Sequence, residues 1–446
     1  MNAVKWNSLL LLFILVAMAM IAGCTCDDDD DDNDAADDDD TDDDDTGDDD
    51  TGDDDTEDDD TDDDDDDTGP SPAEPFIEAG KAYLRLGAGD LAREEFLLAK
   101  AADAEHEGGY YGNALADLVH DFDVISIIDS YIEMLLGFQP PEKDGVPDTG
   151  QGMIDQVIQL ALEGLVTERS DELVEQVEWL RTEAPDVIFE LDRMPIILFF
   201  EEVADFHGDF DLPDAVAAEA MARLLGGLIE HLLALNLDFN IGVIFDVMDM
   251  DWGDYSTEEI VGAIIDIGLA LLDDPAFPNV FTLKEDGAPF KAAGLKMGLG
   301  WANAAETYSL IIAETTPQTA EVFGYSDLNG DNAWQENEPL YLQPWEELNE
   351  HDNQVAWEFR DVFQSLADSF LDYTEYDTDP ENPQPFNLSE LNVILHAIGL
   401  PSLIPSWALL DIDFGAAYRD ADPTAFRDTL VSIFTLLDPL FPDMYP

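Results

Sequence analysis

The chain has 446 residues, of which 105 are acidic and 16 are basic, so its formal net charge is −89 at pH 7. Recognition of nucleic-acid phosphates depends on Lys and Arg, and this charge therefore excludes nucleic acid as a partner. The same charge opposes electrostatic docking on anionic lipid. Hydrophobic residues make up 46% of the chain, which is enough to bury a core in about two or three domains.

The first residues have the layout of a secretory signal peptide. The basic residue Lys5 precedes an apolar run from Leu9 to Ile21. A membrane-spanning helix needs about 20 apolar residues, so this run is too short to span a bilayer. We therefore expect residues 1–23 to be a signal peptide that is removed during export.

The quartet Ile21-Ala22-Gly23-Cys24 ends this stretch. It resembles the lipobox of bacterial lipoproteins, in which the cysteine becomes the first mature residue and carries acyl chains such as palmitate. The resemblance implies lipidation at Cys24, and two or more acyl chains hold a protein durably on a membrane. In that family an aspartate directly after the cysteine favours the inner membrane. Because Thr25 stands there, the resemblance implies an outer-membrane lipoprotein that faces the periplasm or the cell surface. The alternative is an ordinary signal peptide or short anchor with an incidental cysteine.

The segment from Asp27 to Asp67 holds 31 acidic residues, interrupted only by Asn, Ala, Thr and Gly. Such a segment has no apolar surface to bury and repels itself, so we expect a disordered, Asp-rich tether over residues 24–75. Fully stretched, residues 27–67 could reach about 130 Å. The tether could also collect Ca²⁺ weakly, since carboxylates are preferred calcium ligands.

Acidity continues beyond the tether. Once Lys5 is removed with the signal peptide, 74 acidic residues face 15 basic residues, which leaves a charge of −59 on the body. Charge of this density predicts a salty or calcium-rich medium, in which screening relieves the self-repulsion of the surface.

A helical pattern begins at Phe76. Large, small and aromatic residues recur there at a fixed spacing: Phe76, Gly80, Tyr83, Gly87, Ala92, Phe96 and Ala99. The spacing resembles a tetratricopeptide repeat (TPR), whose two helices approach through small residues. The resemblance implies a TPR-like helical region over residues 76–139, with a turn at Gly87-Ala88-Gly89-Asp90 and a third helix from Gly109 to about His120. Ala104 departs from the family, which usually has proline there, and a lone repeat must stack on another element.

Residues 140–446 form the predicted helical body, which begins with a linker at Pro140–Gly150. From residue 124 onward the chain shows helical periodicity without convincing strand alternation. We expect helices at Val124–Leu136, Met153–Leu165, Leu173–Leu180, Pro213–Leu235, Ile260–Leu272, Pro289–Ile312, Pro344–Leu371, Leu388–Ile398 and Pro423–Leu437. The predicted fold class is therefore all-α, with TPR-like helical hairpins that continue into an irregular α-helical array after a disordered poly-Asp tether.

The stretch from Asp327 to Glu338 alternates side chains that carry oxygen. It resembles the EF-hand calcium loop, and more closely the D-x-N-G-D loops of bacterial extracellular proteins. The resemblance implies a Ca²⁺ site, because Ca²⁺ takes about 6 to 8 oxygen ligands and this alternation places them around one centre. The implied ligands are the side chains of Asp327, Asn329 and Asp331, the carbonyl of Ala333, Gln335 directly or through water, and the bidentate carboxylate of Glu338.

Two positions depart from the EF-hand pattern. Asn332 stands where the family prefers Gly, and it is tolerable because Asn enters the left-handed region more readily than most residues. Trp334 and Pro339 stand where a paired EF-hand has a small aliphatic residue and the start of its exit helix. The loop is thus expected to be a structural clip, and an acidic surface turn is the alternative.

No catalytic signature stands out in the sequence, which lacks H-E-x-x-H, G-x-S-x-G, C-x-x-C and Walker motifs. The leading interpretation is a non-catalytic scaffold at the cell envelope that binds a protein or peptide, with Ca²⁺ as a structural cofactor. Two alternatives remain open. One is a hydrolase or polysaccharide-active enzyme with unidentified acidic catalytic residues, and the other is a calcium-dependent surface adhesin.

Overall fold

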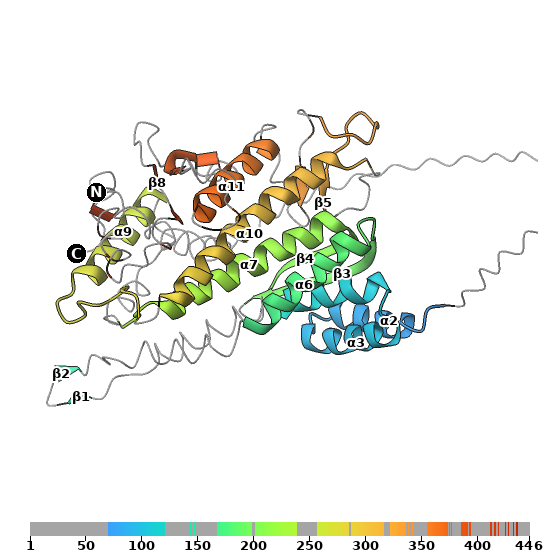
Figure 1. Ribbon diagram of the computed structural model, residues 1–446, viewed down its shortest axis with the longest axis horizontal. Helices are drawn as coiled ribbons and strands as arrows, with labels where there is room; N and C mark the ends of the chain where they lie inside the picture. The colour runs from blue at the N-terminus through green and yellow to red at the C-terminus, as the bar shows by residue number, and fades with distance from the viewer. Residues whose placement is uncertain are drawn as a thin grey trace, which may run out of the picture.

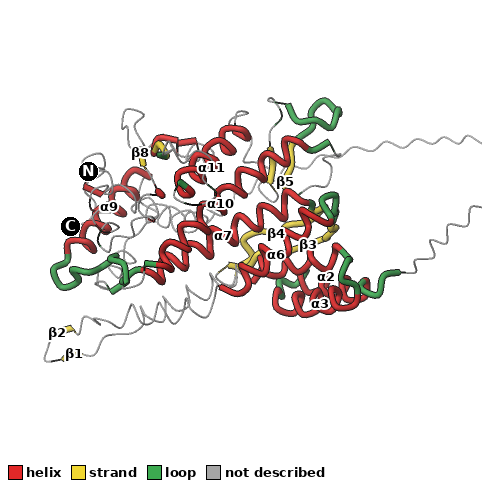
Figure 2. Tube along the Cα trace, in the orientation of Figure 1, coloured by secondary structure: helices red, strands yellow, loops and turns green. Residues whose placement is uncertain are grey.

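The structure is a computed structural model. It describes residues 70–120, 142–143, 146–147, 167–198, 201–238, 257–284, 287–315, 322–335, 338, 340–342 and 355–372, with short pieces between 374 and 435 (Figure 1; Figure 2). The signal peptide, Cys24, the tether and the predicted helices Val124–Leu136 and Met153–Leu165 lie outside these residues.

The described chain is mostly helical, with several short antiparallel strand pairs. Its α-helices are α2 (Glu74–Leu84), α3 (Gly89–Ala102), α6 (Thr167–Glu183), α7 (Leu212–Ala234), α9 (Thr257–Asp273), α10 (Ala288–Ala313) and α11 (Val355–Leu371), and residues 107–120 are also helical. The strands are β1 (Glu142–Lys143), β2 (Val146–Pro147), β3 (Phe189–Leu198), β4 (Glu201–Phe210), β5 (Phe323–Tyr325), β6 (Leu340–Leu342), β7 (Phe386–Asn387) and β8 (Asp411–Ile412), with a 3₁₀ turn at Leu388–Glu390.

Among the described residues, helix α7 contributes to two hydrophobic cores. The first core joins α2, α3, the 107–120 helix, α6 and β3, and it includes Ala215 and Val216 from the start of α7. The second core joins α9, α10 and α11 and includes Ala234 from the end of α7. Figure 1 shows α7 and α10 lying side by side across the middle of the molecule. The pair therefore connects the two cores.

The first helical hairpin, α2 and α3, closes around one aromatic side chain. Phe96 of α3 has no exposed surface. A Cβ added to Gly80 of α2 would stand 2.5 Å from the Phe96 ring, and one added to Gly112 would collide with the same ring. On another side, the ring meets Phe189 of β3 edge-on, with 6.1 Å between centroids. The glycines therefore let α2 and the 107–120 helix approach α3 closely.

The turn between α2 and α3 requires glycine at one position. Gly87 has a φ of 67°, in the left-handed region that other residues rarely adopt. This geometry turns the chain so that the backbone N–H of Ala88 donates to the carbonyl of Tyr83 at 3.0 Å, the same carbonyl that accepts the N–H of Leu86. Helix α3 begins at Gly89, within the predicted turn.

Strands β3 and β4 form an antiparallel hairpin that the sequence analysis did not predict. The register of the pair shifts between Leu191 and Met194 and again between Ile196 and Ile197. A bulge of this kind breaks the regular alternation of inward and outward side chains. Leu191, Met194 and Ile196 are accordingly all buried despite their uneven spacing. The expectation of a purely α-helical body was wrong for this segment.

The helical periodicity located the long helices of the body correctly. Helix α7 begins and ends one residue before the predicted segment Pro213–Leu235, and α10 extends one residue beyond each end of Pro289–Ile312. Helix α11 occupies the described part of Pro344–Leu371. Two further predictions are confirmed as parts of longer helices, Ile260–Leu272 within α9 and Leu173–Leu180 within α6.

The substitution Phe96→Ala is expected to lower the free energy of unfolding by about 3 to 5 kcal/mol, the range for removing a large aromatic side chain from a core. Denaturant or thermal unfolding measures the change. The matched control is Leu98→Ala on the same helix, where the leucine is 48% exposed and the expected change is below about 1 kcal/mol. Equal small losses in both variants would contradict the central role of Phe96.

Candidate functional site

The predicted calcium ligands lie on one turn between β5 and β6. These strands pair antiparallel, with Tyr325 opposite Leu340, and Tyr325 is fully buried. The strand pairing brings Asp327 and Glu338 to the base of the same turn. Of the residues between them, 336 and 337 lie outside the described part of the chain.

The Asp327 carboxylate organises the first half of the loop. Its Oδ1 accepts hydrogen bonds from the backbone N–H groups of Gly330 at 2.7 Å and Asn329 at 3.3 Å, and its Oδ2 accepts one from Asn332 at 2.8 Å. These bonds favour the charged form, and they lower the pKa of Asp327, with the Asn332 bond contributing most. The loop therefore keeps an ionised carboxylate at the first of the predicted ligand positions.

The Glu338 carboxylate closes the loop from the other end. Only 2% of its surface is exposed. Its Oε1 accepts the backbone N–H of Leu328 at 3.0 Å, and its Oε2 accepts that of Gln335 at 2.9 Å. The Trp334 indole donates to the Glu338 carbonyl at 3.0 Å. One buried acid thus connects both halves of the turn.

Two left-handed residues complete the turn. Gly330 has a φ of 76° and Asn332 a φ of 53°, so the expectation that Asn332 can replace glycine at the sixth position is confirmed. Asn329 accepts the backbone N–H of Asp331 at 2.9 Å, and Asp331 accepts that of Ala333 at 3.0 Å. The second oxygen of Asp331 accepts the Gln335 side-chain amide at 3.0 Å, so every predicted ligand residue belongs to one hydrogen-bonded turn.

The donor chemistry of this turn fits Ca²⁺, although its carboxylates do not converge on one point. Within the described ranges, no three His, Cys, Asp or Glu side chains are grouped closely enough to hold a metal by themselves. A calcium site here would therefore need the Asn329 amide and a backbone carbonyl beside the carboxylates. Each carboxylate oxygen has two lone pairs. Asp327 Oδ1 already accepts two N–H groups, whereas Asp327 Oδ2 and the two carboxylate oxygens of Glu338 accept one each and can still bind a cation.

A second polar cluster lies where α6 meets its neighbours. On the side of α3, the Arg93 Nε lies 3.0 Å from Asp117 of the 107–120 helix, and Arg93 also pairs with Glu172 of α6. On the side of α7, Glu219 has no exposed side-chain surface and lies 2.6 Å from Arg181 of α6. We call Arg93, Asp117, Glu172, Arg181 and Glu219 the ion-pair seam.

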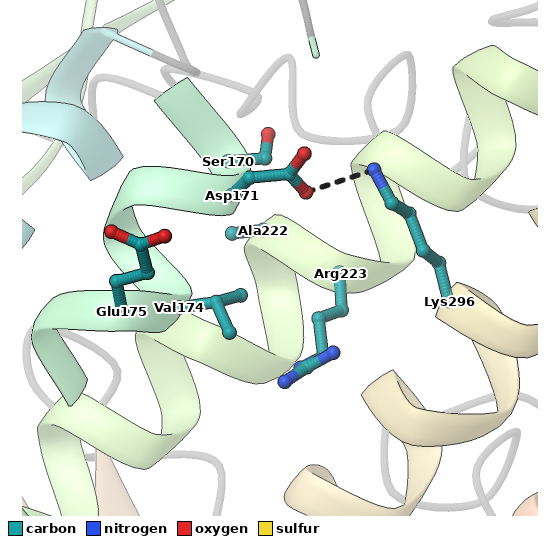
Figure 3. A pocket seen from close by; sticks show the side chains of 7 residues that line it. All are labelled: Ser170, Asp171, Val174, Glu175, Ala222, Arg223 and Lys296. Carbon is teal, nitrogen blue, oxygen red and sulfur yellow. Dashed lines mark ion pairs between the residues drawn. The ribbon is translucent and has the colours of Figure 1, made fainter. Parts of the chain in front are cut away.

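A hollow of about 350 Å³ opens between α6, α7 and α10 (Figure 3). Its lining residues are Ser170, Asp171, Val174, Glu175, Ala222, Arg223 and Lys296. The Lys296 amine lies 3.0 Å from Asp171 and 2.7 Å from Glu230, and the Arg223 Nε lies 2.7 Å from Glu219. Figure 3 shows the Lys296 amine directed at Asp171, with the Arg223 guanidinium directed away from it. The charged groups of Lys296 and Arg223 do not point to a common centre. The hollow is therefore a place where three helices meet and not a site with converging charges.

Sequence reasoning located the calcium-type turn but missed the ion-pair seam. The turn carries its signal in the spacing of its oxygen-bearing residues. The residues of the seam come from four elements distant in sequence, and single acidic and basic residues at ordinary helical positions carry no such signal. The only sequence feature that points to them is the scarcity of basic residues, which makes each one a candidate partner for a buried acid.

Asp117 is the titratable centre of the seam. Burial, together with the charge of Glu172, raises the pKa of Asp117 to about 7 against the opposing effect of Arg93. Asn113 also donates to Asp117 at 3.3 Å. A carboxyl group whose pKa is raised in the folded state stabilises the protein at low pH, and this contribution is lost as pH rises through the folded-state pKa.

The substitution Asp117→Asn is expected to remove the part of the pH dependence of the unfolding free energy that comes from Asp117. In the wild type, the contribution of Asp117 should fall by about 1.4 kcal/mol per pH unit between about pH 4 and pH 7. The neutral amide removes this slope, so the variant should gain stability relative to the wild type as pH rises. Unfolding free energies measured from pH 5 to 8 test this, and Asp361→Asn, at an exposed aspartate, is the matched control. A difference between variant and wild type that does not change with pH would contradict the prediction.

No protein-family model, curated protein or solved structure matches this chain. Among the helices that the structure describes, none is both long and apolar enough to cross a membrane.

Proposed function

We propose that this chain is an outer-membrane lipoprotein of a bacterial cell envelope whose helical body is a non-catalytic scaffold for a protein or peptide. In this proposal acyl chains on Cys24 hold the protein on the membrane, the poly-Asp tether separates the body from the bilayer, and Ca²⁺ stabilises the turn at residues 327–338. The lipobox quartet supports the anchor, because its cysteine stands directly after a short apolar segment and two small residues.

The packing around Phe96 is the observation that carries the scaffold proposal. Gly80 and Gly112 stand where a side chain would collide with the ring, and Ala92 and Ala99 are buried on the same helix as Phe96. Small residues around one large aromatic are what the TPR resemblance implies, so this packing supports a TPR-like unit within residues 76–139. Repeats of this kind stack helical pairs into surfaces that bind partners.

The anchor and the scaffold are tested in the same cells. The substitution Cys24→Ala is expected to release the protein from the membrane fraction, because it removes the lipidated residue, whereas Cys26→Ala should leave it bound. Cross-linking in intact cells, followed by mass spectrometry, is expected to capture a specific protein with the wild type. Membrane association that survives Cys24→Ala would contradict the anchor, and the absence of any specific cross-linked protein would contradict the scaffold.

The geometry of the 327–338 turn supports the calcium proposal. Asp327 stays ionised through its three backbone hydrogen bonds, and Asn329, Asp331 and Glu338 present further oxygens from the same turn. The Ala333 carbonyl and Gln335 complete the proposed ligand set. Bound Ca²⁺ would supply positive charge that connects the two ends of the turn, which makes its role structural.

Ca²⁺ is expected to raise the melting temperature of a chain that begins at Ser71, because the ligands come together only in the folded turn. Mass action adds about 2.7 kcal/mol when free Ca²⁺ is at a hundredfold excess over the dissociation constant. Omitting the first 70 residues removes weak binding by the 31 acids of the tether. Calorimetric titration is then expected to detect one saturable site.

Two charge-matched substitutions make this calcium test specific. Glu338→Gln removes the bidentate carboxylate and is expected to abolish the saturable site. Glu336→Gln removes the same charge from a neighbouring position outside the proposed ligand set, and the site should survive. Equal loss in both variants, or a wild type without a saturable site, would identify the segment as an acidic turn.

A further inference from the structure

The outer face of α3 exposes a patch of apolar side chains. We define this outer face by the exposed residues Leu91, Leu97, Leu98, Ala101 and Ala102. Leu91 is 46% exposed and Leu98 is 48% exposed, and residues at this spacing lie on the same side of an α-helix. Single exposed apolar residues are ordinary on protein surfaces, whereas three partly exposed leucines on one helix of 14 residues indicate a site of interaction.

The basic residues of α3 do not belong to this outer face. Arg93 pairs with Asp117 and Glu172 of the ion-pair seam. Lys100 donates a hydrogen bond to Gln176 of α6 at 2.5 Å. Both side chains are therefore engaged with the 107–120 helix and α6. Figure 1 shows α2 and α3 at the lower edge of the molecule, with α6 and the β3–β4 hairpin on their inner side.

Acidic residues remain beside the leucines. Glu94 is exposed and lies between Leu91 and Leu98 along the helix, and Glu95 next to it is partly exposed. The residues from Thr68 onward also carry a net charge of −59. The outer face thus combines an apolar stripe with negative charge. Basic side chains complement it, whereas a second copy of this chain or an anionic lipid surface would be repelled.

We infer that the outer face of α3 docks a basic amphipathic helix of a partner protein. Helix α3 has 14 residues, or a length of about 21 Å, which matches about four turns of a partner helix. Ala101 and Ala102 are small, so a second helix can approach closely there. Apolar residues at i, i+3, i+4 and i+7 of the partner contact the leucines, and flanking Lys or Arg reach Glu94. The inference rests on the proposed scaffold function and names the class of its partner.

The test uses the full-length protein and a fluorescein-labelled peptide of about 18 residues, which contains only Leu and Lys and has one apolar face as a helix. A control peptide has the same composition in an order without an apolar face. Fluorescence anisotropy is expected to show tighter binding of the amphipathic peptide. The double substitution Leu91→Ser/Leu98→Ser should weaken this binding by about tenfold or more, because both leucines lose their apolar contact.

The matched control is Ile188→Ser/Met221→Ser, at apolar residues that are 60% and 41% exposed elsewhere in the fold. Neither pair changes charge, so attraction of the peptide to the tether and the acidic surface is the same in all variants. The control pair is expected to keep the wild-type affinity. Equal binding of the two peptides, equal weakening by both pairs, or self-association of the wild type that Leu91→Ser/Leu98→Ser abolishes would overturn the inference.

A second experiment distinguishes failure of the inference from failure of the proposed function. In this experiment a photo-reactive amino acid replaces Leu98, Met221 or Leu328, one position at a time. In cells, a cross-link from position 98 to a basic amphipathic segment, identified by mass spectrometry, is expected. Specific cross-links from position 221 or 328 but not from 98 would overturn docking on α3 and leave the scaffold function in place. No specific cross-link from any of these positions would count against the scaffold function itself.

Discussion

Positive charge is scarce in this protein, and its placement determines how the helices are held together. From Thr68 onward, 15 basic residues face 74 acidic ones. Arg93, Arg181 and Lys296 each bridge two carboxylates from different elements, and every bridge includes α6. A buried acid is costly to leave without its partner. The arrangement of helices around α6 therefore depends on a few cations whose loss would leave carboxylates such as Glu219 uncompensated.

The ion pairs and the two cores have different roles in the fold. Leu173, Val177 and Leu180 are the fully buried apolar residues of α6, and such burial supplies most of the stability of a packed helix. Buried ion pairs often add little net stability, because desolvation offsets their attraction. Their effect here is positional, because each of these three cations joins acids from two different elements. Burial holds α6 in place, and the ion pairs of Arg93, Arg181 and Lys296 connect it to α3, α7 and α10.

The parts of the fold that sequence reasoning recovered are those whose signal lies within one segment. Pro213–Leu235 has a continuous apolar stripe, and α7 coincides with it to within one residue at each end. The β3–β4 hairpin was missed because register shifts after Leu191 and Ile196 disrupt the period of two that reveals a strand. The 327–338 turn was located by spacing, but the link from Glu338 to the N–H groups of Leu328 and Gln335 depends on the pairing of β5 with β6. Pairing between strands leaves no pattern within one segment of the sequence from which it could be predicted.

The scarcity of cations also gives a physical reason for the proposed calcium site. Among the described residues, no Lys or Arg forms an ion pair with Asp327, Asp331 or Glu338, and backbone and side-chain amides satisfy their oxygens instead. Amide dipoles stabilise these carboxylates without cancelling their charge, so the turn remains a centre of negative potential. A divalent cation would neutralise it as Arg93 and Arg181 neutralise the acids around α6. An acidic chain in a calcium-rich medium can thus obtain from the solvent the cross-linking charge that its own sequence lacks.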